Sequence, residues 1–300
     1  MKVKKYIILL LCTVILTTGC STQNKVNNED KNQNQTQQSD YNKDYKLTYT
    51  NLVDDKTKEE IVIKLKDAGV KEDSINYFME KVNSYNKIMK EMKGLQGGYI
   101  TTELPEASFD DVYSSQKWEK EGYLYQDFNC RLTAFEIMKD FINSGSQYTG
   151  DSSNLFMDLD SIDNYPLSKF NKEDKDKFIN LFAAIKAEDT KDYQVHVDTI
   201  KKELEKRNIS FNTNGKISMI NGYLHDYDTK ELFVGHSGVL IEDKEGLTFV
   251  EKYSFLTPYI VSKFNTRKEL YSYLMNRLDV DTTGNGSKPI IMENDNVMQF

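Results

Sequence analysis

The chain has 300 residues, of which 29% are charged and 38% hydrophobic, and its formal net charge is −8 at pH 7. It is long enough to bury a substantial core. The net charge is acidic, and no basic stripe or long run of Lys and Arg gives electrostatic support for nucleic-acid binding. We therefore expect no nucleic-acid partner. Three well-separated histidines without a Cys/His cluster do not make a zinc site, so we expect no metal and no cofactor.

The N-terminus has the pattern of a secretory signal. Three lysines lie in the first five residues, an apolar run follows over 6–16, and Thr17, Thr18 and Gly19 precede Cys20. The pattern predicts a signal peptide over 1–19, since the apolar run is too short to span a bilayer. The small residues before Cys20 resemble the lipobox of bacterial lipoproteins. That resemblance implies a lipidated Cys20 and a membrane anchor on the extracytoplasmic face. The alternative is an ordinary signal peptide with a chance cysteine.

Processing would leave one unpaired thiol. Cys12 leaves with the signal and Cys20 carries lipid, so Cys130 has no internal disulfide partner. Loss of the three leader lysines changes the net charge from −8 to −11.

The rest of the chain divides by composition. Residues 20–45 are polar and predict a disordered tether. Residues 46–300 predict a single α+β domain, with a helical part over 46–210 and a sheet-rich part over 211–300.

Apolar periodicity predicts the elements of this domain. Helices are expected at 55–67, 72–92, 130–142, 172–185, 195–207 and 266–278. The aspartate-rich stretch 146–165 is expected to be a solvated loop, because its aspartates lack the spacing of a calcium loop. Strands are expected at 216–226, 231–242, 247–255 and 289–292. The first three form an antiparallel meander with turns at 226–230 and 243–246.

Cys130 opens one of the predicted helices. Asp127 and Asn129 before it favour an N-cap, and the first-turn N–H groups and the helix dipole stabilise a thiolate. Those N–H groups also suit an oxyanion. The alternative is a buried cysteine that acts as an inert small hydrophobe.

His236 lies on the middle strand of the meander. It is flanked by Gly235 and Gly238, which suggests close approach of a substrate or of the cysteine helix. A histidine beside a thiol supplies the base that a cysteine nucleophile needs. His196 and His225 are interpreted as structural or exposed.

Two residues are candidates to orient His236. If the turn at 243–246 pairs Glu242 with Leu247, Glu251 lies on the face of His236, with Tyr253 on the same face. The alternative for Glu251 is a surface carboxylate paired with a lysine. The turn at 226–230 makes Asn221 the second candidate.

This order of a cysteine helix, a histidine strand and a strand with a polar residue resembles the papain-like cysteine peptidases, in particular the NlpC-type enzymes of bacterial cell envelopes. The resemblance is carried by Asn129-Cys130-Arg131, Gly235-His236-Ser237-Gly238-Val239 and Val250-Glu251-Lys252. Glu251 stands where these enzymes have His, Asn or Gln. Residues 46–300 also resemble an uncharacterised family of Gram-positive lipoproteins, known as a domain of unknown function.

The resemblance implies a papain-like packing of the cysteine helix on the sheet and a thiol peptidase or amidase. Cys130 would be the nucleophile, His236 the base and Glu251 the orienting residue. Gln126 and Asn129 are further oxyanion or orienting candidates. Peptides or peptidoglycan are the expected substrates of a monomeric, membrane-anchored protein. The alternative is a binding or scaffold lipoprotein without catalysis.

Overall fold

The computed structural model describes residues 41, 46–103, 106–145 and 148–300. The predicted signal peptide, the predicted lipidation site at Cys20 and nearly all of the predicted tether lie outside this range. Within the described part of the chain, no helix combines the length and the apolar character needed to cross a membrane.

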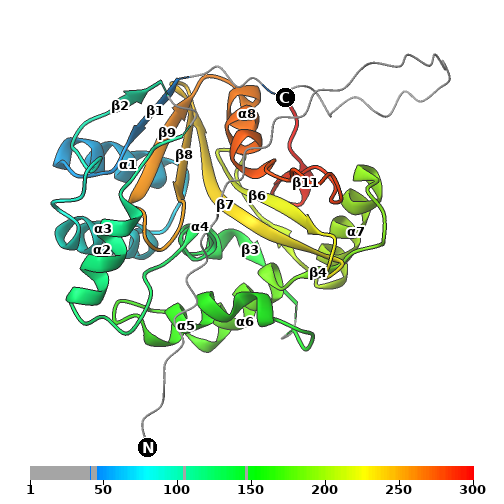
Figure 1. Cartoon of the computed structure of the whole chain (residues 1–300). Coiled ribbons are helices and arrows are strands. Elements are labelled where there is room, and N and C mark those ends of the chain that lie inside the picture. The colour runs from blue at the N-terminus through cyan, green and yellow to red at the C-terminus, as the bar shows by residue number, and fades with distance from the viewer. Residues whose placement is uncertain (1–40, 42–45, 104–105, 146–147) are drawn as a thin grey trace, which may run out of the picture. The chain divides into compact units, whose positions relative to one another are not determined.

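A large antiparallel sheet forms the middle of the domain (Figure 1). Its nine strands follow the order β11-β10-β6-β7-β8-β9-β1-β2, and β4 pairs with β7 beside this path. The strands are β1 Leu47–Thr50, β2 Ile100–Thr102, β4 Ile185–Lys186, β6 Ile217–Asp226, β7 Glu231–Asp243, β8 Gly246–Lys252, β9 Tyr259–Phe264, β10 Ile290–Glu293 and β11 Asn296–Val297. Two short strands, β3 Ile142–Asn143 and β5 Ser210–Phe211, form a separate pair.

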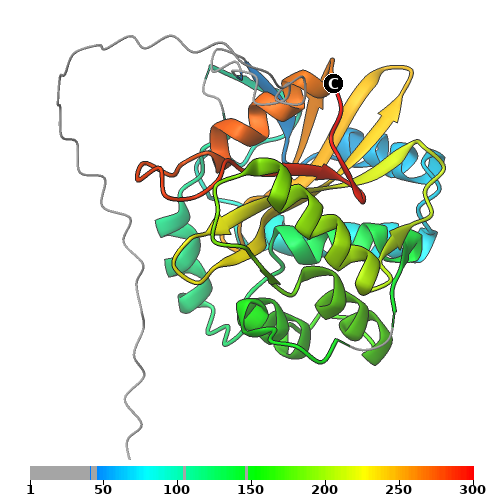
Figure 2. The same ribbon diagram turned by 90° about the vertical axis from the view of Figure 1, so that its right-hand side faces the viewer.

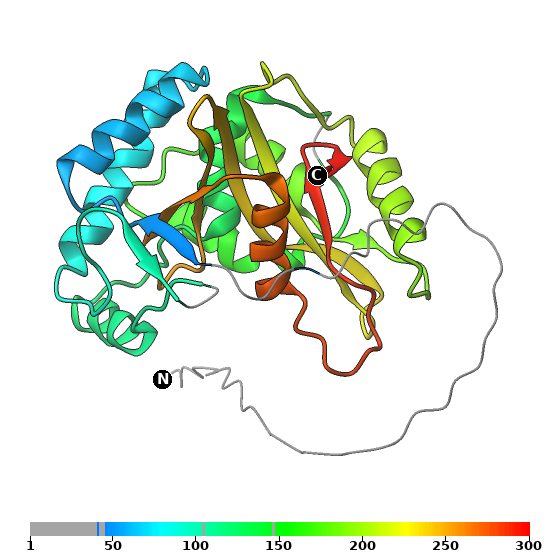
Figure 3. The same cartoon turned by 90° about the horizontal axis from the view of Figure 1, so that it is seen from above.

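Eight α-helices in the described residues cover the sheet. They are α1 Asp55–Asp67, α2 Glu72–Ile88, α3 Asp111–Lys120, α4 Cys130–Met138, α5 Phe156–Asn164, α6 Lys172–Phe182, α7 Tyr193–Lys206 and α8 Arg267–Leu278. In Figure 2 the strands cross the molecule between α8 and the green helices α5 and α6. Figure 3, seen from above, places α8 on one side of the sheet and the green helices on the other.

The alternation of side chains along the strands builds two cores, one on each face of the sheet. Phe249 and Leu240 belong to the core that holds the apolar side of α8. Their neighbours Val250 and Val239 belong to the larger core with α2 and α4. Strands buried on both faces explain the nearly continuous apolar runs of β7 and β8.

The meander and most helices are confirmed where the sequence predicts them. β6, β7 and β8 match the three expected strands, and the pairing of Glu242 with Leu247 is confirmed. Helix α2 ends at Ile88, short of the expected 92, and α4 ends at Met138, where a 3₁₀ turn over Lys139–Phe141 takes over.

Two expectations about organisation are wrong. The stretch 146–165 is not only a solvated loop: it contains a 3₁₀ turn at Ser153–Leu155 and α5, because Asp158 on α5 is buried in an ion pair with Arg131. The helical part does not simply precede the sheet. β1 pairs with β9 and β2 pairs with β1, so N-terminal strands cover the far edge of the meander.

Two ion pairs are fully buried beneath α4. Lys81 on α2 contacts Glu136 on α4, and Lys252 at the end of β8 contacts Asp127, three residues before α4. Burial lowers the pKa of Lys81 to about 8 and raises the pKa of Glu136 to about 7, against the opposing effect of each partner's charge. Such pairs fix geometry more than they add stability.

Candidate active site around Cys130

Cys130 is the first residue of α4. Asn129 caps the helix, because its Oδ1 accepts the N–H of Leu132 at 3.1 Å. Of the two residues expected to cap the helix, Asn129 is the cap. Asp127 instead accepts the N–H of Phe128 and binds Lys252. The thiol stands where the unpaired N–H groups and the positive end of the helix dipole favour a negative charge.

The pairing between β7 and β8 ends near the start of α4. The pairing of β7 with β8 stops at Gly238 and Glu251, although β7 continues for seven more residues toward its start. Past this point the N-terminal end of α4 takes the place of the strand. The N–H of Ser237 bonds to the thiol of Cys130, and Nη1 of Arg131 donates to the carbonyl of Val234 at 2.9 Å.

This arrangement brings the three predicted residues Cys130, His236 and Glu251 together. Nε2 of His236 lies 2.6 Å from Oε2 of Glu251, and the imidazole is hydrogen-bonded to the thiol of Cys130. Because Nε2 faces the carboxylate, Nδ1 is the ring nitrogen left for the thiol. All three residues are buried, with 7% of Cys130, 3% of His236 and 0% of Glu251 exposed.

The pKa values of Cys130 and His236 are both shifted in the direction of a thiolate–imidazolium pair. Burial raises the pKa of the Cys130 thiol, but the hydrogen bond and charge of His236, the charge of Arg131 and the N–H of Ser237 together hold it below its usual value. Burial and Arg277 lower the pKa of His236, yet its hydrogen bonds to Cys130 and Glu251 leave it raised. Shifts in these directions are those of an activated cysteine.

Helix α8 supplies two partners of Glu251 that sequence reasoning missed. The hydroxyl of Tyr273 donates to Oε1, and Nη1 of Arg277 lies 3.1 Å from Oε2. The hydroxyls of Tyr273 and Tyr253 are also hydrogen-bonded, at 2.7 Å. The i,i+4 spacing of Tyr273 and Arg277 places both on one helix face, but the sequence does not say which face of the sheet that helix covers.

A second network holds the cysteine helix from the other side. Asp158 is fully buried and accepts Nε of Arg131 at 3.1 Å and Nδ2 of Asn129 at 2.8 Å. Both hydrogen-bonding groups of the Asn129 amide are therefore engaged, one by the cap and one by Asp158. Asn129 therefore caps the helix, and its role as an oxyanion or orienting residue stays a prediction.

The glycines beside His236 serve the packing of the sheet. A Cβ on Gly235 would lie 2.4 Å from Leu224 Cδ1, and a Cβ on Gly238 would lie 2.2 Å from Phe249 Cζ. The expected approach of a substrate or of the cysteine helix is not the reason for them. Gly235 is also the additional residue of a bulge in β7 opposite Gly222 and Tyr223, which turns the strand just before His236.

The remaining candidates lie near the site without joining the triad. Asn221 pairs with Ser237, whose hydroxyl donates to its Oδ1 at 2.7 Å, so it projects from the opposite face to His236. Gln126 is half-buried on the loop before α4, and its role as an oxyanion donor stays a prediction. The ring centroids of His196 on α7 and His225 on β6 lie 4.4 Å apart, with the rings tilted by 51°, which fits a structural role for both.

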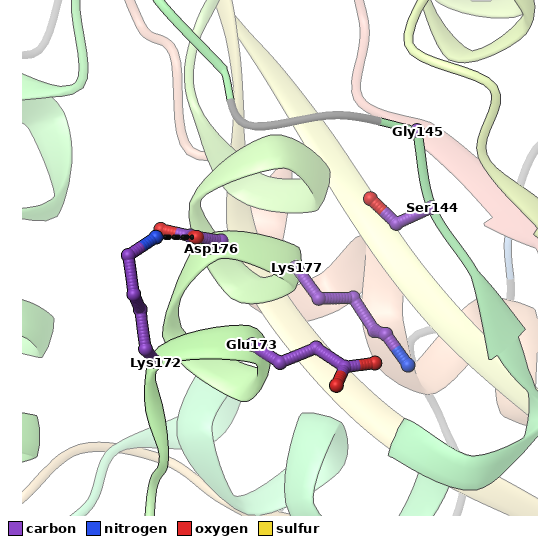
Figure 4. A pocket seen from close by; sticks show the side chains of 6 residues that line it. All are labelled: Ser144, Gly145, Lys172, Glu173, Asp176 and Lys177. Atoms are coloured by element: carbon purple, nitrogen blue, oxygen red, sulfur yellow. Dashed lines mark hydrogen bonds and ion pairs between the residues drawn. The ribbon is translucent and has the colours of Figure 1, made fainter.

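An open cavity of about 370 Å³ lies elsewhere, between the start of α6 and the residues after β3. It is lined by Ser144, Gly145, Lys172, Glu173, Asp176 and Lys177. Figure 4 shows the side chains of Glu173 and Lys177 extending together, while Lys172 pairs with Asp176. None of the triad residues borders it.

Comparison with known proteins identifies one family. No curated protein and no solved structure matches this chain. A model of a domain of unknown function, DUF4300, matches residues 48–298, which includes every strand and helix described above apart from the first residue of β1. The chain therefore belongs to the DUF4300 family.

Proposed function

We propose that the protein is a thiol hydrolase that cleaves amide or ester bonds with Cys130 as its nucleophile. The observation that carries the proposal is the position of His236 between the thiol of Cys130 and the carboxylate of Glu251. A nucleophile, a base and a group that orients the base are the three parts of a catalytic triad. The papain-like arrangement belongs to the same proposal.

The chemistry follows from the protonation of the pair. The Cys130 thiolate attacks the carbonyl carbon of the substrate, and a tetrahedral intermediate forms. Imidazolium His236 then gives its proton to the departing amine or alcohol, which leaves a thioester on Cys130. Neutral His236 next takes a proton from water as the water attacks the thioester. The bond between the carbonyl carbon and the sulfur breaks, the carboxylic acid departs, and the thiolate–imidazolium pair is restored.

The helix end provides the oxyanion donor. The first N–H groups of an α-helix have no partner within the helix, and the N–H of Cys130 is the first of them. We expect it to donate to the carbonyl oxygen on which charge develops after attack by the Cys130 side chain. Gln126 on the preceding loop is the second donor that we propose.

The substrate class follows from the proposed location. With a lipid anchor on Cys20, the domain would face the extracytoplasmic side of a bacterial membrane. Cell-wall peptides and secreted peptides are the amides available there. This part of the proposal rests on the sequence of the leader and its resemblance to a lipobox.

The test is incubation of the wild type and of Cys130→Ala with peptidoglycan fragments and with a peptide library, read by mass spectrometry. We expect products with the wild type and none with Cys130→Ala. Glu251→Gln should lower the rate without abolishing it, because the thiol and imidazole remain. Equal product formation by wild type and Cys130→Ala contradicts the proposal.

A binding protein without catalysis is the second candidate. The specific observation in its favour is the burial of the thiol, because only 7% of Cys130 is exposed. In that case the triad geometry would be structural. Saturable binding of peptidoglycan fragments, with no cleavage by wild type, would support this candidate over the hydrolase.

A further inference from the structure

Glu251 is a buried carboxylate with an unusual set of partners for an orienting group. His236 Nε2 and Arg277 Nη1 both approach its Oε2, at 2.6 and 3.1 Å, and the Tyr273 hydroxyl donates to its Oε1. The same oxygen is thus shared between the imidazole and a permanent cation. No part of Glu251 is exposed to water, so these partners, and not solvent, determine its effective charge.

Arg277 is held firmly in this position. Its Nε lies 3.1 Å from Oε2 of Glu106, and its guanidinium carbon lies 3.6 Å above the ring of Tyr253. The guanidinium is planar and always charged. It is therefore a fixed positive charge at the same carboxylate oxygen that His236 approaches.

A bare carboxylate in this place would bind the imidazolium too strongly. A buried negative charge beside a histidine favours its protonated form, and the effect is large where water is excluded. A base that must release its proton to a leaving group and take another from water needs a proton affinity near the working pH. A neutral side chain would orient the ring without this penalty.

We propose that Arg277 is a positioning residue that neutralises Glu251, so that the Glu251–Arg277 pair orients His236 as a neutral hydrogen-bond acceptor would. This inference rests on the proposed function of the triad. The charge of Arg277 also explains how a Glu at this position can orient His236 as a neutral amide or imidazole would. Tyr273 assists because its hydroxyl occupies the other oxygen and fixes the plane of the carboxylate.

The charges that face His236 come from three elements. Helix α4 supplies Cys130 with Arg131 beside it, β8 supplies Glu251, and α8 supplies Arg277. Arg277 lowers the pKa of His236, whereas the hydrogen bonds to Cys130 and Glu251 raise it. Removing Arg277 therefore shifts the balance toward imidazolium.

The test is an NMR titration of the His236 ring in the full chain, assigned with a His236→Ala variant. We expect Arg277→Gln to raise the pKa of His236 by about one unit or more. Arg277→Lys keeps the charge and should stay near the wild-type value. Arg267→Gln is the matched control, because Arg267 lies on the same helix but pairs with Glu242 and Glu293 away from the site.

The double variant Glu251→Gln/Arg277→Gln keeps the test decisive if Arg277→Gln does not fold. Both charges are then absent, and we expect the pKa of His236 to stay near the wild-type value. Glu251→Gln by itself should lower it, because Arg277 is then uncompensated. An unchanged pKa in Arg277→Gln, or a double variant that follows Glu251→Gln, overturns the inference. The titration needs no turnover, so its outcome is separate from that of the Cys130→Ala experiment.

Discussion

At the scale of single residues, the close packing of Gly238 against Phe249 predicts that adding a methyl group at Gly238 is destabilising. A Cβ at Gly238 would lie 2.2 Å from the ring of Phe249, which is itself fully buried. Gly238→Ala therefore overpacks the sheet and should lower the free energy of unfolding by about 1–3 kcal/mol. Urea denaturation followed by circular dichroism measures this.

A double variant separates this clash from other causes. Phe249→Leu creates space beside Gly238, so Gly238→Ala should cost less in that background than in the wild type. Equal costs in the two backgrounds would mean that the contact with Phe249 is not the reason for a glycine at this position.

At the scale of elements, the buried ion pair of Lys81 and Glu136 lies between α2 and α4. Removing either charge leaves the other buried without a partner, so Lys81→Met and Glu136→Leu should each cost about 3–5 kcal/mol. Replacing both removes the desolvation cost of both charges, and the double variant should be close to wild type or more stable.

The wild type, the two single variants and the double variant form a double-mutant cycle, and thermal unfolding measures the stability of each. The surface pair of Lys117 on α3 and Glu121 at its C-cap is the control, and its removal should leave the stability close to that of the wild type. A double variant at Lys81 and Glu136 that is as unstable as either single variant would contradict this account of the pair.

The elements also show which parts of the fold the sequence specifies. Apolar periodicity and turn residues are local signals, so α1, α8, β6 and β7 are predicted close to their observed bounds. β9 and α5 are not predicted. β9 is short and follows Pro258, and the aspartates of α5 indicate a loop until their tertiary partner is known. Local patterns do not encode a partner that lies far away in the chain.

The sequence likewise predicts one part of the candidate site and not the other. The position of Glu251 relative to His236 follows from the register of a tight turn, which the sequence contains. The contacts of Tyr273 and Arg277 depend on α8 packing over one face of the sheet and not the other. That choice belongs to the tertiary structure, so sequence reasoning missed both residues.

At the scale of the whole molecule, the site joins the layers on the two faces of the sheet. Consecutive residues of β8 point to opposite faces. Glu251 is bound by α8 through Arg277, and Lys252 is bound by Asp127 on the loop that leads into α4. The end of one strand thereby holds the cysteine helix and the C-terminal helix in fixed positions around His236.

If His236 activates the thiol of Cys130, the thiol reacts as a thiolate at lower pH than a free thiol does. The pH dependence of its alkylation measures this. The rate of iodoacetamide labelling of the Cys130 peptide is followed by mass spectrometry between about pH 4 and 9. Its midpoint reports the thiol pKa independently of how far burial slows the reagent. The pKa of Cys130 is lowered by His236, so the thiolate appears at lower pH than in a free thiol, whose pKa is about 8.5.

We predict a midpoint well below that of a free thiol in the wild type. His236→Ala removes the hydrogen bond and the charge that lower the thiol pKa, so its midpoint should move to higher pH. His225→Ala changes a histidine outside the site and should leave the midpoint where it is in the wild type. A wild-type midpoint at or above the value of a free thiol, or one that His236→Ala does not move, would contradict the account.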